Sequence, residues 1–472
     1  MYTLEDLRQE QVAVVGFGQE GQTVAKYLVT HGIKPVILDV KAFSDLSTEA
    51  RETISDLQLE LRSGPDYLSS AKDFSVLFRS PGVWRLNPLL IKAEQNDTYV
   101  SSLTQWMFDN LQCKTIGITG TKGKTTTASL LYQILQTHLR QHASESRVYL
   151  TGNIGTSDPL IILDQARPTD IVVYELSSFQ LQDLKRAPDI AVVLMTTIDH
   201  LDHHKTSDEY WDAKRNIVSK QSQNQLVVIN IDYEGSRSIA DGLSAKNLFT
   251  ISKKVKTKQG IYISESGILH YTGLPGRTIG HISASNTVLR GAHNLENFAA
   301  AALVALLLGA DPDSIESVIK NFTGVKHRLE LVANHSGIKF YDDSIATVPE
   351  SSIAALQSFT EPTIAILGGS LKGSDYTDLG MFIARSNTIK AIILLGEAGK
   401  LIQKAIEQVG GFSGTIIENC KTMEEIFQTI KTLAVPGDVV VLSPAAASFG
   451  LFKSYQDRGN QFRLHAIAWK ST

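Results

Sequence analysis

A short run of residues near position 120 has the types and spacing needed to hold a chain of phosphates. Gly120, Gly123, Lys124 and Thr125 stand in the order Gly-x-x-Gly-Lys-Thr, directly after an apolar, β-branched segment. In such a turn, backbone N–H groups and the start of the next helix attract phosphate oxygens. Lys124 could then reach the terminal phosphates and Thr125 could ligate Mg²⁺. The strict pattern begins with a glycine where this chain has Ile118, so only its core is present. We therefore predict a site for a nucleoside triphosphate.

A second glycine turn lies near the N-terminus. The run 16–21 reads Gly-Phe-Gly-Gln-Glu-Gly between an apolar strand and a helical segment, and Asp39 ends the next strand. This pattern is typical of a Rossmann-like dinucleotide site, where the glycines admit a pyrophosphate and the acid binds a ribose. The same turn can hold the pyrophosphate of a UDP-sugar, and it also occurs without any ligand.

Polar residues follow several other predicted strands. Glu175 ends the strand 171–174, where a carboxylate near a phosphate loop can ligate Mg²⁺, although a surface cap is the simpler alternative. His200 follows the strand 190–194 and is placed to touch Mg²⁺ or substrate. The neighbours His203 and His204 would point apart, which argues against a zinc site.

Two helical segments carry further candidates. Asn294 and Asn297 are three residues apart at the start of an alanine-rich helix, so they share one face and could read a nucleobase or ribose. Helix capping is the alternative for Asn294. Lys214 has, from its own segment, the character of a solvated surface lysine.

A further segment with an alternating strand and helix pattern begins near residue 324. Apolar strands around 340, 364–367, 392–395 and 439–442 each end in small or polar residues. The carboxyl ends of such strands form one edge of a sheet, where ligands bind. We expect Arg328 and Asp343 to face the nucleotide from the side opposite Lys124.

Size and composition set broad limits. The chain has 472 residues, 43% hydrophobic and 20% charged, which is typical of a soluble globular protein of about three domains. A net charge of −4 gives no indication of a nucleic-acid or membrane partner. With only Cys113 and Cys420, no signal peptide and no apolar run long enough to span a bilayer, we expect a cytoplasmic protein.

In order along nearly the whole chain, these and other motifs resemble those of the Mur ligases, and most closely the branch that adds glutamate. The matching runs are SPGV (80–83), GTKGKTTT (120–127), GNIG (152–155), ELSSFQL (175–181), DHLDHH (199–204), GAHNLENFAAA (291–301), HRLE (327–330), DDSIAT (342–347), GGSLKG (368–373), LSPAAASF (442–449) and DRG (457–459).

The resemblance implies an α/β protein of three domains: a Rossmann-like UDP-binding domain (1–112), a P-loop ATPase domain with a mostly parallel sheet (113–324) and a Rossmann-like domain that brings the amino acid (325–472). The implied activity is ATP-dependent addition of D-glutamate to UDP-N-acetylmuramoyl-L-alanine through an acyl phosphate. This reaction belongs to peptidoglycan precursor synthesis, and thus to cell-wall biogenesis, cell shape and cell division. A monomer that uses ATP and a pair of Mg²⁺ ions is expected.

The resemblance also implies roles for single residues, with Lys124, His200 and Lys214 as catalytic residues and Lys214 as a carbamylated lysine. ATP contacts are implied for Gly120, Thr121, Lys122, Gly123, Lys124, Thr125, Thr126, Asn297, Arg328 and Asp343. UDP-substrate contacts are implied for Gln19, Glu20, Asp39, Ser80, Asn153 and Gln180, glutamate contacts for Thr347, Lys372, Ser448 and Tyr455, and metal ligation for Thr125, Glu175, His200 and carbamylated Lys214.

The chain departs from the family pattern at two positions. Ile345 stands where the family has a lysine in DSKATN, and Tyr455 stands where it usually has phenylalanine. With Pro349, the variant run resembles a branch that can use L-glutamate, so the configuration of the amino acid stays open.

Three other functions remain as alternatives: two enzymatic and one non-catalytic. A folylpolyglutamate synthase-like ligase lacks a counterpart of the N-terminal UDP-type domain. A Rossmann oxidoreductase leaves Lys124 and the C-terminal domain without a role. The loss of the lysine at Ile345 would also suit a non-catalytic Mur-like protein.

Overall fold

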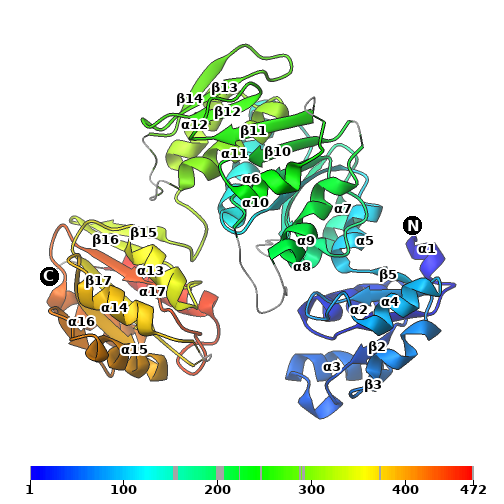
Figure 1. Cartoon of the computed structure of the whole chain (residues 1–472). Coiled ribbons are helices and arrows are strands. Elements are labelled where there is room, and N and C mark those ends of the chain that lie inside the picture. Colours follow the sequence, from blue (N-terminus) through cyan, green and yellow to red (C-terminus); the bar gives the residue numbers. More distant parts are fainter. Residues whose placement is uncertain are drawn as a thin grey trace. The chain divides into compact units, whose positions relative to one another are not determined.

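The structure is a computed structural model that describes residues 2–152, 158–197, 207–222, 224–244, 247–285, 287, 289, 293–371 and 374–469. It contains two compact units, one of residues 1–286 and 293–320 and one of residues 287–292 and 321–472. Two sheets lie in the first unit and one in the second (Figure 1). The α/β prediction is confirmed, whereas the exact limits of three domains stay a prediction. No helix in the described part of the chain is long and apolar enough to cross a membrane.

The first sheet is fully parallel, with the strand order β3-β2-β1-β4-β5. Strand β1 is apolar and buried, and the strand order reverses on either side of it, so its carboxyl end is the place where a Rossmann-like sheet binds a ligand. The strands are β1 (Val12–Val15), β2 (Val36–Asp39), β3 (Leu61–Ser63), β4 (Val76–Arg79) and β5 (Tyr99–Ser101), and the helices are α1 (Leu4–Leu7), α2 (Gln19–Thr30), α3 (Thr48–Asp56), α4 (Pro88–Gln95) and α5 (Leu103–Asn110), with 3₁₀ turns η1 (Phe43–Asp45) and η2 (Tyr67–Asp73).

The second sheet has the order β14-β13-β12-β11-β10-β9-β6-β8-β7, and all its strand pairs are parallel except β12–β13 and β13–β14, which are antiparallel. Its strands are β6 (Lys114–Thr119), β7 (Val148–Gly152), β8 (Ile171–Glu175), β9 (Ile190–Val193), β10 (Leu226–Asn230), β11 (Leu248–Ser252), β12 (Gly260–Ile263), β13 (Ile268–Thr272) and β14 (Gly280–Ser283). Its helices are α6 (Lys124–Gln141), α7 (Pro159–Gln165), α8 (Ser178–Leu181), α9 (Ser207–Ser219), α10 (Glu234–Ala240), α11 (Asn294–Leu307) and α12 (Pro312–Asn321).

Strand β6 lies between β8 and β9, and the long helix α6 follows it directly. Helix α11 packs against α6 and is buried along most of its length, because its own alanine, leucine and valine side chains make it apolar on every face. The alanine-rich helix that the sequence predicts is therefore confirmed. Together β6, α6 and α11 give the phosphate loop a rigid support.

The third sheet, in the second unit, has the order β15-β16-β20-β17-β18-β19 and is parallel except for the β15–β16 pair. Two apolar cores cover its two faces. The strands are β15 (Glu330–His335), β16 (Ile338–Asp342), β17 (Thr363–Gly368), β18 (Ile389–Leu395), β19 (Thr415–Ile417) and β20 (Val439–Leu442), and the helices are α13 (Pro349–Leu356), α14 (Thr377–Arg385), α15 (Gly396–Gln408), α16 (Met423–Leu433) and α17 (Tyr455–Ile467).

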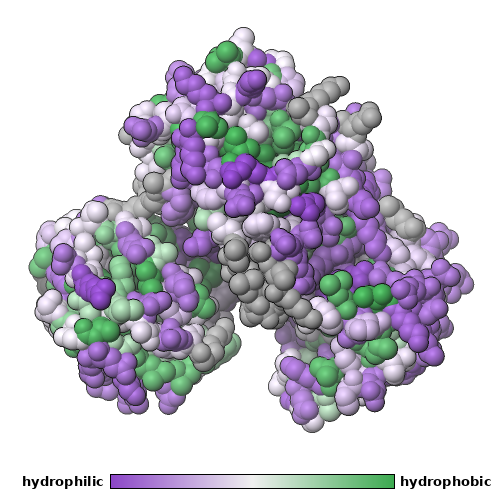
Figure 2. All heavy atoms as spheres, viewed as in Figure 1, coloured by the Kyte–Doolittle hydropathy of each residue, from purple (hydrophilic) through white to green (hydrophobic). Residues whose placement is uncertain are grey.

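On the face of the molecule that Figure 2 shows, hydrophilic and neutral residues cover most of the surface, and strongly hydrophobic residues form small groups. Small exposed apolar groups of this kind are normal for a folded chain, because apolar atoms contribute much of any protein surface.

Candidate active site

The turn between β6 and α6 needs both of its glycines. Gly120 and Gly123 have φ angles of 154° and 89°, which residues with a side chain rarely adopt. A β-carbon at Gly123 would lie 2.2 Å from Oδ1 of Asn297, and one at Gly120 would lie 2.8 Å from Cβ of Leu194. The turn ends at the N-terminus of α6, where N–H groups and the helix dipole favour an anion. The predicted strand–turn–helix is confirmed.

Lys124 curls back over this turn. Its Nζ donates hydrogen bonds to the carbonyl oxygens of Gly120 at 2.8 Å and Thr121 at 3.2 Å. The positive charge is thus held above the loop, where it can meet phosphate oxygens. The neighbouring Lys122 is exposed, whereas Thr126 is buried.

The predicted pair of metal ligands is brought together. Thr125 Oγ1 donates to Oε1 of Glu175 at 3.2 Å, and both side chains are buried. Glu175 is the last residue of β8, next to β6, so the sheet places its carboxylate beside the loop. A hydroxyl and a carboxylate are the oxygen ligands that Mg²⁺ prefers, and the pair fits that ion.

The two asparagines of α11 are also joined to the loop. Thr127 Oγ1 donates to Oδ1 of Asn297 at 3.4 Å, and Asn297 Nδ2 donates to Oδ1 of Asn294 at 2.9 Å. The predicted shared helix face is confirmed. Asn294 is the first residue of the helix and His293 holds the cap position, so capping does not explain Asn294.

Lys214 lies inside the protein, and the prediction of a solvated lysine from its segment is wrong. It is 1% exposed. Its Nζ donates to Oγ1 of Thr119 and to the carbonyl oxygen of Gly120, both at 3.3 Å, and lies 4.6 Å from the centre of the Tyr210 ring. Helix α9 packs so that Lys214 faces β6. The pattern of apolar residues within the helix does not predict this orientation. The buried ammonium therefore belongs to the phosphate-loop site.

In the first sheet, Asp39 and Ser80 shape the glycine turn. Asp39 Oδ2 accepts from the N–H of Phe17 at 2.6 Å, and Ser80 Oγ donates to the carbonyl oxygen of Gly16 at 2.6 Å. Gln19 is exposed at the start of α2. The turn and its acidic residue therefore come together at the switch point, as predicted.

Glu20 and Gln180 join the turn of the first sheet to the second sheet. Gln180 Nε2 donates to Oε1 of Glu20 at 2.9 Å, and Gln180 Oε1 accepts from Ser177 in a capping box of α8. Burial raises the pKa of Glu20. The two residues predicted to contact the UDP-substrate from different sheets are thus direct neighbours.

A buried ion pair that sequence reasoning missed lies close by. Arg79, at the end of β4, donates from Nη2 to Oδ2 of Asp183 at 2.6 Å, and Arg85 Nε lies 2.7 Å from the other oxygen of Asp183. Neither Arg79 nor Asp183 has an exposed side chain. The only sequence indication was an arginine that ended an otherwise apolar strand, and its partner lies 104 residues away.

In the second unit, Asp343 is buried at the carboxyl end of β16. Its Oδ2 accepts from Ser443 Oγ at 2.7 Å and its Oδ1 accepts from the N–H of Leu329 at 3.0 Å. Burial raises its pKa to about 7, although the nearby Arg328 opposes this shift. Arg328 Nε is buried and has no hydrogen-bond partner among the residues that the structure describes.

Replacing Asp343 with asparagine is expected to change how stability depends on pH. The carboxyl titrates near its ordinary 3.8 when unfolded and near 7 when folded, so its contribution to stability is full below pH 4 and is lost as the pH rises through 7. From pH 5 to pH 8, the unfolding free energy of the wild type should fall by roughly 3 kcal/mol relative to Asp343→Asn. Urea unfolding at both pH values measures this difference, and parallel pH profiles for the two proteins would contradict it.

Arg458 of the DRG motif fixes the loops after β16 and β20. It is fully buried, and its guanidinium donates to Ser344 Oγ at 2.9 Å and to the carbonyl oxygen of Ala446 at 3.2 Å. Ser344 Oγ in turn donates to the carbonyl oxygen of Tyr455 at 2.8 Å. The candidate glutamate residues Thr347, Ser448 and Tyr455 lie on the segments that Arg458 and Ser344 join. Asn153, His200 and Lys372 lie outside the described residues.

Comparison with known proteins gives close relatives along the whole chain. The model of the Mur ligase middle domain matches residues 118–305, and that of the Mur ligase, glutamate ligase domain, matches residues 327–446. Proteins named UDP-N-acetylmuramoylalanine–D-glutamate ligase are 35% identical in Acetivibrio thermocellus, over 97% of this chain and 96% of the relative, and 33% identical in Ruminiclostridium cellulolyticum, over 97% of both.

Solved structures share the fold at lower identity. UDP-N-acetylmuramate-alanine ligase MurC of Thermotoga maritima has a TM-score of 0.55 at 18% identity and covers 98% of this chain and 100% of its own. MurF of Acinetobacter baumannii has a TM-score of 0.59 at 16% identity, and the match covers 97% of this chain and 90% of the MurF chain. Since both family models match and the relatives cover almost the full length, this chain belongs to the Mur ligase family.

Proposed function

We propose that the protein is an ATP-dependent acid–amino-acid ligase that joins D-glutamate to UDP-N-acetylmuramoyl-L-alanine in peptidoglycan synthesis. The observation that carries the proposal is the phosphate loop, with Lys124 folded over it and the Thr125–Glu175 pair beside it, in a chain whose full-length relatives bear the name of this ligase. Cytoplasmic location and a monomeric state belong to the same proposal, and the buried free thiols of Cys113 and Cys420 suit a reducing compartment.

The reaction has two steps. A carboxylate oxygen of the UDP-substrate attacks the γ-phosphorus of ATP, which gives an acyl phosphate and ADP. The amine of glutamate then attacks the acyl carbon, the phosphate leaves with the bonding electron pair, and the amine gives up a proton as the amide forms. Lys124 stabilises the charge that develops on the transferred phosphoryl group, and because its ammonium is already held over the loop it needs little rearrangement.

The Thr125–Glu175 pair and the buried Lys214 suggest how the protein holds Mg²⁺. Thr125 and Glu175 would ligate one ion, and Mg²⁺ neutralises phosphate charge when it is bound. Carbamylated Lys214 and His200 would serve the second ion. A carbamate at Lys214 would turn a cation that lies beside Gly120 into an anionic ligand.

The substrates are assigned to separate groups of residues. Gln19, Glu20, Asp39, Ser80, Asn153 and Gln180 would hold the UDP-substrate. The loop, Asn297, Arg328 and Asp343 would hold ATP, and Thr347, Lys372, Ser448 and Tyr455 would hold glutamate. The product can be tested by incubating the protein with ATP, Mg²⁺, UDP-N-acetylmuramoyl-L-alanine and D-glutamate and searching by mass spectrometry for the amide. Formation of ADP without any amide would overturn the proposed reaction.

A second candidate substrate is L-glutamate, because the run that contains Ile345 and Pro349 resembles a branch of the family that can use this enantiomer. Its side chain is half-buried in the loop after β16, and its N–H donates to the carbonyl oxygen of His327 at 3.1 Å. An apolar residue cannot supply the charged hydrogen bond of a lysine.

Replacing Ile345 with lysine is expected to raise the ratio of kcat/KM for D-glutamate over L-glutamate about tenfold. The proposal assigns the charged hydrogen bond of this lysine to D-glutamate alone, and such a bond contributes about 1.5–3 kcal/mol. Steady-state rates with each enantiomer measure this ratio, with Ile345→Val as an apolar control. An unchanged ratio would show that Ile345 does not set the preference.

A further inference from the structure

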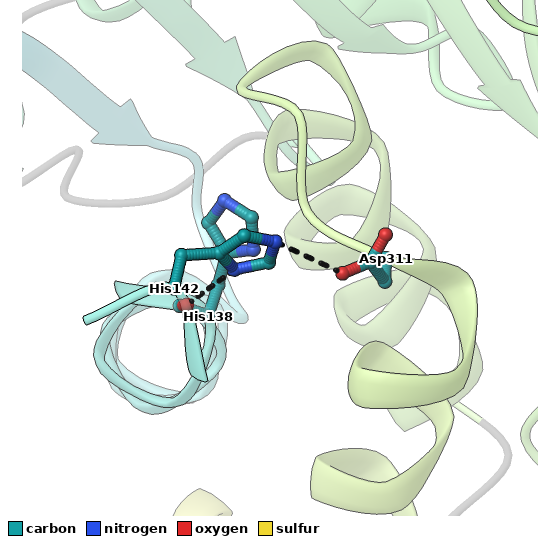
Figure 3. Close-up of side chains that lie close together, drawn as sticks. All are labelled: His138, His142 and Asp311. Carbon is teal, nitrogen blue, oxygen red and sulfur yellow. Dashed lines mark hydrogen bonds and ion pairs between the residues drawn. The ribbon is translucent and has the colours of Figure 1, made fainter. Parts of the chain in front are cut away.

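A group of three metal-ligating side chains lies at the end of α6 remote from the phosphate loop. His138 and His142 come from the last turn of α6 and from its C-cap, and Asp311 precedes α12. One nitrogen of each ring and one oxygen of the carboxylate all lie within 4.8 Å of one another. Figure 3 shows the two rings together on the side of α6 that faces Asp311. The four-residue spacing of the histidines places them on one helix face.

The second ring is held in the orientation of a metal ligand. His142 Nδ1 lies 2.9 Å from the carbonyl oxygen of His138, and a proton donated there leaves the lone pair on Nε2, which lies 3.7 Å from Asp311 Oδ2. Histidines that bind metals commonly donate their other N–H to a carbonyl in this way. Figure 3 draws both interactions.

The first ring is also suited to ligation. Nδ1 of His138 is buried and, within the described part of the chain, has no hydrogen-bond partner. The two ring centroids are 4.4 Å apart.

The surroundings include both favourable and unfavourable charge for a cation. The C-terminal end of α6 carries partial negative charge, and Asp311 adds a carboxylate. Against this, the Arg277 guanidinium donates to the carbonyl oxygens of Leu306 and Ala310. A direct bond from Ser314 Oγ to Gln141 Oε1, at 2.6 Å, already holds α12 beside α6, so the two backbones need little movement.

We propose that His138, His142 and Asp311 bind one divalent transition-metal ion, with Zn²⁺ as the best fit and water as the fourth ligand. Two imidazoles and a carboxylate are a common zinc ligand set. Ligand atoms around tetrahedral zinc lie about 3.3 Å apart, and small rotations of the half-exposed His142 and Asp311 side chains close the remaining distance. Since α6 has 18 residues and is about 27 Å long, the ion would join α6 to α12 far from the phosphate loop.

The test uses the full-length protein after chelator treatment. Zn²⁺ binding is measured by titration calorimetry, and the thermal unfolding midpoint is measured with and without Zn²⁺. Both His142→Ala and Asp311→Asn are expected to weaken zinc binding at the cluster at least tenfold and to remove the zinc-dependent rise of the midpoint. These side chains are half-exposed, so both variants should fold.

The matched control is His270→Ala, because His270 and His281 face each other across β13 and β14 with ring centroids 6.4 Å apart and could bind zinc themselves. In this control variant, Zn²⁺ is expected to raise the thermal unfolding midpoint as it does in the wild type. Loss of the rise in His270→Ala with its retention in His142→Ala would overturn the proposal, and so would a wild-type protein that binds no zinc.

Discussion

Replacing Lys124 with alanine is expected to lower kcat for ligation about a thousandfold. The ammonium is held over the phosphate loop by the carbonyl oxygens of Gly120 and Thr121, where charge develops on the transferred phosphoryl group. Removing one positioned electrostatic group of this kind typically costs about 10²–10³ in kcat. The steady-state rate of amide formation at saturating ATP measures the effect.

A matched control comes from the same strand. Lys114 is exposed at the first position of β6, at the end away from the loop, so Lys114→Ala should keep the wild-type rate. Retention of the wild-type kcat in Lys124→Ala would remove the phosphate-loop assignment.

Replacing Lys214 with alanine is expected to lower kcat at least a hundredfold, with partial recovery in the presence of acetate. The side chain is buried against Thr119 and Gly120, so a carbamate formed on it would lie beside the loop. A short carboxylate can enter the space that the truncated side chain leaves and replace the missing anion. The rate is measured against increasing acetate concentration, with chloride at equal ionic strength as the control.

Recovery of kcat with acetate would distinguish a catalytic carbamate on Lys214 from a purely structural role of this lysine. A variant with low activity at every acetate concentration and a lowered unfolding midpoint would point to a packing role. Wild-type activity in Lys214→Ala would contradict any role in the site. A carbamate can also be observed directly, as a ¹³C signal in wild-type protein supplied with labelled bicarbonate.

The parts of the site that depend on local sequence could be predicted. Glycine at positions 120 and 123 is required by backbone angles, and Glu175 reaches the loop because a β-branched run forms a buried strand next to β6. Neighbouring parallel strands bring their carboxyl ends to one edge, which explains why residues from separate motifs meet there.

The parts that depend on tertiary packing could not be predicted from local pattern. Lys214 looks like a surface residue until α9 packs toward β6, and the Arg79–Asp183 pair joins positions 104 apart. The raised pKa of Asp343 follows from its burial in the folded unit, which neighbouring residues in the sequence do not determine. The resemblance to the family identified Lys214, whereas nothing in the sequence indicated Asp183.

The most direct test of the central proposal is phosphate release from ATP by the full-length protein with Mg²⁺ and UDP-N-acetylmuramoyl-L-alanine, measured with D-glutamate, with L-glutamate and with neither. The proposal predicts release that depends on D-glutamate and is lost in Lys124→Ala. Release that depends on L-glutamate would keep the mechanism and change the amino acid. Absence of release with both enantiomers would contradict the proposed ligase activity.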